Sequence, residues 1–395
     1  MKHFDVIVVG AGPVGGYIAG ALARKGYSVA LLEEHREIGK PVQCAGLVSP
    51  RVFEVLGYES GIVNKVRGAV IHSPTGRTLG FESQKPKAYV IDRTEFDSRI
   101  VHDAVDSGIE MKLSSKVLEA GYHEKGIIVK SKEAGQRVET SANLIIGADG
   151  CGSVVAKNFG FSQPKEVLAG FGAQFVGEYT PDKGFVDIFV GNNVAPGFFA
   201  WNIPTEDGAR IGLCVTTNKH GPRHYFDSLQ KNKALRERMK HLELERYIAG
   251  VIPIGQMKTI CTDRVMLAGD AAAQVKPLSG GGIYLGLLAG KYCAEVAAGA
   301  LENNELLEKN LREYENLIKN DVGKELKRAY ALRKIYRGLK DKHLEEGFDI
   351  LGDEKIRGFI AKSGDIDYPA SLTKAVLQKA PKLMKFAGPV LKSLI

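Results

Sequence analysis

Residues 4–33 read FDVIVVGAGPVGGYIAGALARKGYSVALLE, and this stretch decides the fold of the chain. A short β-rich apolar run, residues 4–9, enters a glycine turn, and helical spacing then continues over residues 17–25. A second apolar run, residues 28–32, ends at Glu33. The order strand, tight turn, helix, strand and acid predicts a Rossmann-like dinucleotide-binding unit.

Each residue of the turn has a separate task in this interpretation. Gly10 permits the turn, Gly12 lets backbone approach a pyrophosphate, and Gly15 allows the helix to pack closely on the strand. We expect Val14, in the same turn, to lie against the cofactor. Glu33 is placed to accept hydrogen bonds from a ribose, and its charge disfavours a 2′-phosphate, so NADP fits poorly.

Length and charge limit the class of protein. A chain of 395 residues suits two closely packed domains with an added helical tail. The net charge of +8 is concentrated near the end, where residues 321–395 hold 16 Lys/Arg and 10 Asp/Glu. An anionic headgroup or a membrane surface is one reading of this excess, and a solvated face of amphipathic helices is the other. We expect no nucleic-acid partner.

The cysteines predict neither a metal site nor a disulfide framework. There are five of them, an odd number, and no C-x-x-C pair occurs. The first residues run straight into a strand without the pattern of a secretion signal, so we expect a cytoplasmic protein. The most apolar stretch, residues 277–290, is too short and too rich in glycine to span a bilayer. Contact with the inner face of the cell membrane is therefore expected to be peripheral.

Two further glycine–carboxylate motifs follow. LIIGADG at residues 144–150 ends a strand at Asp149, and RVMLAGDAA at residues 264–272 ends a strand at Asp270 before PLSGGGI at 277–283. In this order after the first motif, they resemble the flavoprotein monooxygenase and geranylgeranyl reductase superfamily over about the first three quarters of the chain. That superfamily has the fold of para-hydroxybenzoate hydroxylase.

The resemblance implies FAD as cofactor. It implies an α/β fold with a Rossmann-like, three-layer ββα FAD-binding domain of para-hydroxybenzoate hydroxylase type, an antiparallel-sheet substrate domain and a C-terminal helical region. It further implies that Asp149 belongs to the FAD site, that Asp270 binds the ribityl chain, and that Gly282 and Ile283 offer N–H groups to the flavin ring. A helix starting there directs its positive end at the charge that develops on reduced flavin.

The resemblance also fixes expected domain boundaries. The FAD-binding domain is expected in three parts, residues 1–75, 93–160 and 256–305. The substrate domain is expected in two parts, residues 76–92 and 161–255. A helical region is expected over residues 306–395.

The segment DRTEFD at residues 92–97 fits the same scheme. Thr94 is expected to cap a helix, with Asp97 at the third helical position. By the resemblance, Arg93 matches a position that contacts the flavin dinucleotide. In the following strands, Val117 matches a position whose backbone holds the adenine.

The loop GKPVQCAGL at residues 39–47 bears on the branch of the superfamily. It resembles the cysteine-containing loop of archaeal geranylgeranyl reductases, which lies against the flavin. The resemblance implies FAD contacts from Cys44, Ala45 and Leu47. Cys44 is the candidate catalytic residue, supplying a proton or tuning the flavin, although a cysteine is also often a small buried hydrophobic residue.

The segment PGFFAWNIP at residues 196–204 contains the only tryptophan of the chain. It resembles that family's substrate motif P-x-x-Y-x-W-x-F-P, with Phe199 in place of tyrosine and Ile203 in place of phenylalanine. Phe199, Trp201 and Pro204 are the implied substrate contacts. The same alternation is typical of a half-buried strand that merely packs a sheet.

These resemblances imply an FAD-dependent reductase that saturates C=C bonds of geranylgeranyl chains in archaeal ether (phospho)lipids. The chain has no second G-x-G-x-x-G unit, so ferredoxin or NAD(P)H is the expected electron donor. Two alternatives remain: an FAD monooxygenase acting on an aromatic or polyketide substrate, and a prenyl-lipid carrier like GDI or escort proteins.

Overall fold

The computed structural model describes residues 1–124, 126–216 and 220–386. Its first sheet has a parallel core in which β1 lies between β2 and β11. The strands follow in the spatial order β17 (Cys261–Thr262), β18 (Val265–Leu267), β11 (Gln136–Gly147), β1 (Lys2–Val9), β2 (Val29–Leu32) and β8 (Glu110–Lys112). β1 and β2 are almost fully buried at their C-terminal ends, as expected for strands covered on both faces.

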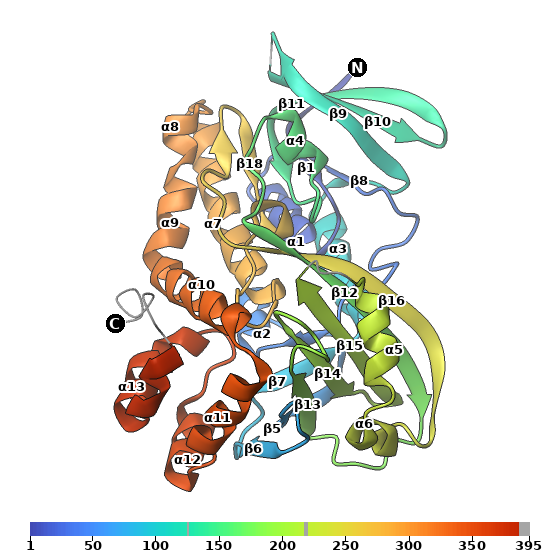
Figure 1. The fold of residues 1–395 in the computed structure, drawn as a ribbon. Coiled ribbons are helices and arrows are strands. Elements are labelled where there is room, and N and C mark those ends of the chain that lie inside the picture. Colours follow the sequence, from blue (N-terminus) through green and yellow to red (C-terminus); the bar gives the residue numbers. More distant parts are fainter. Residues whose placement is uncertain (125, 217–219, 387–395) are drawn as a thin grey trace.

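Three helices pack together against this sheet (Figure 1). They are α1 (Pro13–Ala23), α3 (Arg93–Asp106) and α7 (Ile283–Glu302). The antiparallel hairpin β9 (Ser115–His123) and β10 (Gly126–Glu133) joins the sheet through β11, and α4 (Val154–Asn158) packs on β9. The largest hydrophobic core therefore lies between the parallel strands and α1, α3 and α7.

The second sheet has seven strands and is antiparallel except where β5 meets β13. Two short helices, α5 (Pro222–Leu229) and α6 (Lys233–Arg238), pack on one of its faces. Its spatial order is β16 (Leu242–Ile254), β12 (Glu166–Gly177), β15 (Gly208–Thr216), β14 (Phe199–Pro204), β13 (Phe185–Val190), β5 (Gly68–His72) and β6 (Thr78–Glu82).

The loop of Cys44 leads into β3 (Leu47–Val48), an edge strand of a three-stranded sheet. The order of this sheet is β3, β7 (Ala88–Ile91) and β4 (Ile62–Val66), and α2 (Arg51–Leu56) follows β3. β5 comes directly after β4 but joins the seven-stranded sheet. The expected boundary at residue 75 lies after β5 in the chain, and it stays a prediction.

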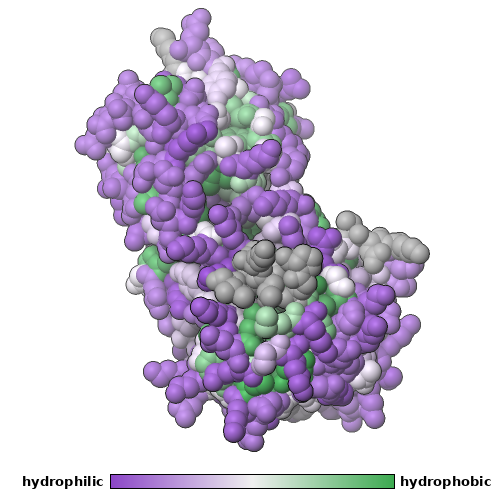
Figure 2. All heavy atoms as spheres, turned by 60° about the vertical axis from the view of Figure 1, so that its left-hand side comes forward, coloured by the Kyte–Doolittle hydropathy of each residue, from purple (hydrophilic) through white to green (hydrophobic). Residues whose placement is uncertain are grey.

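The chain ends in helices on one side of both sheets (Figure 1). In order they are α8 (Glu308–Leu311), α9 (Glu313–Asp321), α10 (Gly323–Gly338), α11 (Asp341–Leu351), α12 (Glu354–Ser363), η2 (Pro369–Leu372), α13 (Thr373–Lys379) and η3 (Pro381–Phe386). The short helix η1 (Gly269–Ala272) precedes α7. Figure 2 shows this side: hydrophobic residues gather in its lower half among hydrophilic ones. Residues 387–395 of the predicted helical region lie outside the described residues.

The predicted cap of α3 is wrong. Asp92, not Thr94, is the N-cap, and its carboxylate accepts from the N–H groups of Thr94 at 2.7 Å and Glu95 at 3.0 Å. Asp and Thr are both good N-caps, so the segment offered two registers. The carboxylate of Asp97 instead forms a paired contact with the Arg93 guanidinium, with N–O distances of 3.0 and 2.7 Å.

Candidate active site

The glycine turn after β1 is closely packed on two of its three glycines. Gly10 has a φ of 97°, and a Cβ there would lie 2.4 Å from the carbonyl oxygen of Ala148 on the neighbouring strand end. A Cβ at Gly15 would lie 1.9 Å from the carbonyl oxygen of Gly10. A Cβ at Gly12 would meet no non-neighbouring described atom within 4 Å. Open space therefore lies against Gly12, at the N-terminus of α1.

Glu33 ends β2 and reaches back to this turn. One carboxylate oxygen accepts from the Ala11 N–H at 2.8 Å, and the other lies 2.6 Å from His35 Nδ1 and accepts from the His35 N–H at 3.0 Å. These contacts fix the carboxylate beside the glycine turn. Carboxylate oxygens have further lone pairs, so Glu33 can still accept from a ribose hydroxyl.

Asp149 and Val14 have packing tasks. The Asp149 carboxylate accepts from Ser153 Oγ at 2.5 Å and from the Val154 N–H at 2.7 Å, so it holds the start of α4. The Val14 side chain packs against Gly286, where a Cβ would come within 2.6 Å of it. Both residues thus hold neighbouring elements together, and their contact with the cofactor stays a prediction.

Asp270 and Gly282 lie next to each other although the intervening loop separates them in sequence. A Cβ at Gly282 would lie 2.9 Å from Asp270 Oδ1. Burial raises the pKa of Asp270 to about 6, and the positive charge of Arg93 partly opposes this. Among the described residues, no group donates a hydrogen bond to this carboxylate. The Asp270 side chain is half-buried, so its oxygens are open to a donor from a bound ligand.

A small, partly open hollow lies beside Asp270. Sequence reasoning did not single out most of its lining, because those side chains come from loops without a periodic pattern. The lining includes Cys151, Ser153, Ser162, Gln163 and Met257.

The N-terminus of α7 is the third feature that lies beside Asp270. Gly282 occupies the N-cap position, and no side chain of the described residues caps the helix. The first turn of a 20-residue helix therefore presents amide groups and the positive end of its dipole beside Asp270 and Ile283. Such an end favours a group that becomes negative.

Cys44 and Arg93 meet from separate segments. The Arg93 guanidinium is mostly buried; burial lowers its pKa, but Asp97 and Cys44 nearby raise it above its ordinary value. The Gly46 N–H donates to Cys44 Sγ at 3.3 Å. The Cys44 thiol is thus half-buried and held beside a cation that also acts on Asp270.

Arg210 was missed by sequence reasoning. It lies on β15 with 5% of its surface exposed, and its guanidinium donates to the carbonyls of Ala45 at 3.1 Å and Ile91 at 2.7 Å and to Gln174 Oε1 at 2.9 Å. It therefore fixes the Cys44 loop against the second sheet. The one signal was an arginine inside the apolar run GARIGLCV, which needs buried partners.

Phe199 and Trp201 lie on the face of β14 that meets the Cys44 loop. Both are half-buried, and their ring centres are 6.2 Å apart. Trp201 packs with a cluster that also includes Ala45 and Leu47, and with a second cluster that includes Val275. The aromatic face thus lies between the Cys44 loop and the segment leading to the glycine loop 277–282.

Pro204 and Val117 lie away from this face. Pro204 is buried at the far end of β14, where its carbonyl accepts from Asn64 Nδ2 at 3.0 Å. Val117 is buried on β9, opposite Ser131 of β10. The structure therefore groups Ala45, Leu47 and Trp201, with Phe199 beside Trp201, but does not bring Pro204 to them.

These features fit FAD. The open side of Gly12 and the N-terminus of α1 suit a pyrophosphate, Glu33 suits a ribose, and the free carboxylate of Asp270 suits hydroxyl donors. All lie at the carboxyl ends of parallel strands, where open α/β sheets bind ligands.

Comparison with known proteins supports FAD as the cofactor. The family model described as FAD binding domain matches residues 3–295. An uncharacterized protein of Methanocaldococcus jannaschii is 34% identical over 95% of both chains, and the digeranylgeranylglycerophospholipid reductase of that organism is 30% identical over 97% of both. A geranylgeranyl bacteriochlorophyll reductase-like protein of Thermoplasma acidophilum has the same fold, with a TM-score of 0.89, 24% identity and full coverage of both chains.

The fold and the site define an FAD-dependent oxidoreductase, and the predicted α/β fold class and FAD cofactor are confirmed. Within that class, the chain belongs to the family of the archaeal digeranylgeranylglycerophospholipid reductases. No helix among the described residues is long and apolar enough to cross a membrane.

Proposed function

We propose that this protein saturates C=C bonds in geranylgeranyl chains of archaeal ether (phospho)lipids. The observation that carries the proposal is the half-buried pair Phe199 and Trp201, of which Trp201 packs in the cluster that includes Ala45 and Leu47, the neighbours of Cys44 in the loop. An apolar, aromatic wall next to a flavin loop suits an isoprenoid chain better than a polar substrate.

Bound FAD, when reduced, supplies the hydride for one alkene carbon. The residues of the chain have the remaining tasks. Gly12, Glu33, Asp270 and the amides at Gly282 and Ile283 hold the cofactor, with Arg93 close by. An isolated alkene is not polarised by a carbonyl, so positioning and exclusion of water must lower the barrier. The wall of Phe199 and Trp201 does both.

A proton must reach the second alkene carbon, and Cys44 is the proposed residue for this step. The Gly46 N–H holds its sulfur atom, so the thiol has a fixed place at the edge of the apolar face. Water is the other possible donor. Cys44→Ser keeps a proton donor and Cys44→Ala removes it, so a far larger loss of turnover in the alanine variant supports the assignment.

The decisive experiment is anaerobic. The photoreduced enzyme is mixed with a geranylgeranyl phosphoglycerolipid, and mass spectrometry counts the hydrogens added to the lipid. A gain in mass together with flavin reoxidation supports the proposal. No gain while the flavin stays reduced contradicts it, and oxygen incorporation into a phenol with rapid NADPH oxidation would identify a monooxygenase instead.

The electron donor is proposed to be ferredoxin or transiently bound NAD(P)H. The part of the chain that the structure describes has one glycine turn between a parallel strand and a helix that suits a dinucleotide, and this turn is assigned to FAD. A nicotinamide would therefore have to bind elsewhere and only transiently. Stopped-flow measurement of flavin reduction by each donor separates the two.

Peripheral contact with anionic lipid is proposed for α13 and η3. Neither element has a buried residue, and residues 369–386 contain four lysines and no acidic residue. Apolar side chains lie among these lysines, with Leu377 half-buried and Met384 exposed. Each lysine near an anionic surface contributes about 1 kcal/mol.

Vesicle co-sedimentation tests this contact. Binding to anionic vesicles that weakens with salt is expected, and Lys374→Glu with Lys382→Glu should remove it. Equal binding to neutral vesicles, or no effect of the substitutions, contradicts the proposal.

A further inference from the structure

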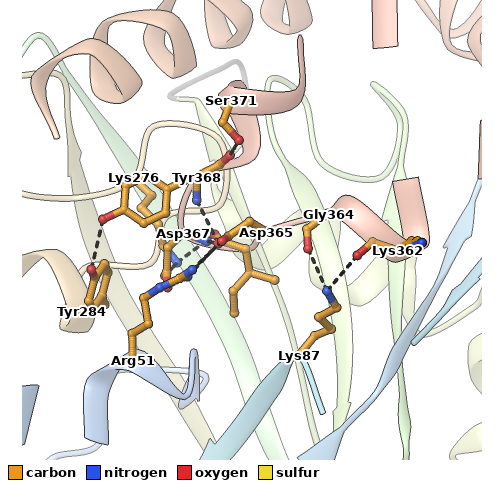
Figure 3. Close-up of polar contacts among 11 residues, drawn as sticks. Arg51, Lys87, Lys276, Tyr284, Lys362, Gly364, Asp365, Asp367, Tyr368 and Ser371 are labelled. Carbon is orange, nitrogen blue, oxygen red and sulfur yellow. Dashed lines mark hydrogen bonds and ion pairs between the residues drawn. The ribbon is translucent and has the colours of Figure 1, made fainter. Parts of the chain in front are cut away.

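A segment near the end of the chain, residues 364–369, crosses over three elements of the flavin side (Figure 3). Asp365 and Asp367 contact Arg51 of α2, with N–O distances of 2.7 and 3.1 Å. Tyr368 lies under the Arg51 guanidinium at 5.2 Å, and its hydroxyl is 3.0 Å from that of Tyr284 in the first turn of α7. We call this segment the strap.

The strap also holds Lys276, the residue directly before the glycine loop. Lys276 is 7% exposed, and its Nζ donates to Asp367 Oδ1 at 2.8 Å and to the Ile366 carbonyl at 3.1 Å. Figure 3 shows the Lys276 side chain directed at the strap. The mechanism above gives no task to this buried ammonium group.

Lys276 braces the loop through both backbone and side chain. Its N–H donates to the Gly281 carbonyl at 3.1 Å, and its carbonyl accepts from the Gly280 N–H at 2.9 Å. A Cβ at Gly281 would lie 2.8 Å from Lys276 Cε and 3.2 Å from Nζ. The ammonium group thus lies directly against the residue before Gly282, the N-cap of α7.

The charges next to Lys276 pair off: two cations, Lys276 and Arg51, contact two carboxylates, Asp365 and Asp367, of which the Asp367 side chain is fully buried. We call these four residues the strap cluster. A further cation, Lys87, donates to the Gly364 carbonyl at the start of the strap at 3.1 Å. With both cations already paired, the cluster is poorly suited to bind a phosphate. Buried charges are weakly screened, however, so removal of either sign would leave a field at the adjacent glycine loop.

We propose that Lys276 and Asp367 are positioning residues for the flavin ring, and that their charge balance sets the reduction potential of bound FAD. The strap is then part of the flavin site although it lies outside residues 3–295. The inference rests on the proposed placement of the ring at Gly282 and Ile283. It does not depend on the lipid substrate.

Electrostatics gives the sign of the effect. Two-electron reduction makes the flavin negative, so an extra positive charge near the loop favours the reduced form and an extra negative charge opposes it. Lys276→Met leaves the cluster with one unbalanced negative charge and should lower the potential. Asp367→Asn leaves one unbalanced positive charge and should raise it. The double variant restores neutrality.

The experiment is an anaerobic, dye-coupled redox titration of the FAD-bound protein. Each single variant should change the equilibrium between oxidised and reduced flavin about tenfold, in opposite directions, which is about 30 mV for a two-electron couple. The double variant should return close to the unsubstituted protein. A purely structural role would give no such reversal of sign or restoration.

Arg77→Gln is the matched control. Arg77 contacts Asp349 of α11 at 2.7 Å and Glu345 at 3.4 Å, so it anchors the same helical region away from the glycine loop. Its potential should be unchanged. If a variant of the buried pair loses FAD, Arg51→Gln, whose side chain is 37% exposed, should lower the potential by removing one cation of the cluster.

Single variants that leave the potential unchanged, or that shift it in the same direction, overturn the inference. Because no lipid enters the titration, that result leaves the proposed lipid reduction untouched. Failure of the lipid assay would equally leave the potentials interpretable.

Discussion

The proposed nucleotide side of the site and its proposed substrate side are built from different parts of the chain. On the nucleotide side, backbone at strand ends forms the site, and the positions of Gly10, Gly12 and Gly15 determine its shape. On the substrate side, side chains from β14 and β15 and from the Cys44 loop meet, as Trp201 and Arg210 illustrate. A site made of backbone groups is determined by a few neighbouring residues, whereas a site made of side chains from several elements depends on long-range packing.

The comparison implies that the two sides respond differently to substitution. Changes at the glycine turn should affect folding or cofactor affinity. Changes on the aromatic face should affect the substrate and leave FAD in place. Four predictions test this division.

Gly15→Ala should have the largest effect. The new Cβ would lie 1.9 Å from the Gly10 carbonyl oxygen, and overpacking against backbone costs about 3 kcal/mol. Urea denaturation measures the free energy of unfolding. Gly299→Ala in α7 is the control: a Cβ there meets no non-neighbouring described atom within 4 Å, and the change should stabilise the helix by about 1 kcal/mol.

Gly12→Ala should separate folding from binding. Because a Cβ at Gly12 meets open space in the protein, the free energy of unfolding without FAD should hardly change. FAD affinity should fall about 100-fold, or about 2.8 kcal/mol, because the methyl group occupies the space of the pyrophosphate. Fluorescence titration of the apoprotein with FAD measures this. Unaltered affinity would remove Gly12 from the cofactor site.

Trp201→Ala should act on the substrate side alone. Truncating a central aromatic contact should raise the KM for the geranylgeranyl lipid about tenfold, with FAD affinity unchanged. Tyr247→Ala is the control, since Tyr247 is a 48% exposed aromatic residue of the same sheet that packs with Phe171. Loss of FAD from Trp201→Ala would break the division between the two sides.

Asp270 should give a gradual effect, a pH dependence of the FAD-free protein that is spread over the range between the two pKa values. Burial raises its pKa from 3.8 to about 6, so between these values the folded state holds a proton that the unfolded state has lost. The free energy of unfolding should therefore fall as pH rises through this range, by less than about 1.4 kcal/mol per pH unit. Asp270→Asn should lack this contribution in denaturation curves at several pH values.

Sequence reasoning was strongest where chemistry follows a strand end. Gly10, Glu33, Asp270 and Gly282 lie at or beside the ends of parallel strands or at the start of a helix, as their local patterns indicated. It was weaker where one segment offered two local solutions. The N-cap of α3 is Asp92 rather than Thr94 because both side chains can cap, and only the packed structure selects one.

By itself, the sequence determined an FAD-binding α/β flavoprotein, because glycine turns, strands and carboxylates act over a few residues each. Only the tertiary structure decided that Arg210 holds the loop of Ala45 and that the strap closes on Lys276 through Asp367. These partners are far apart in the sequence and are brought together by the packing of whole elements. The local pattern of residues therefore does not predict them.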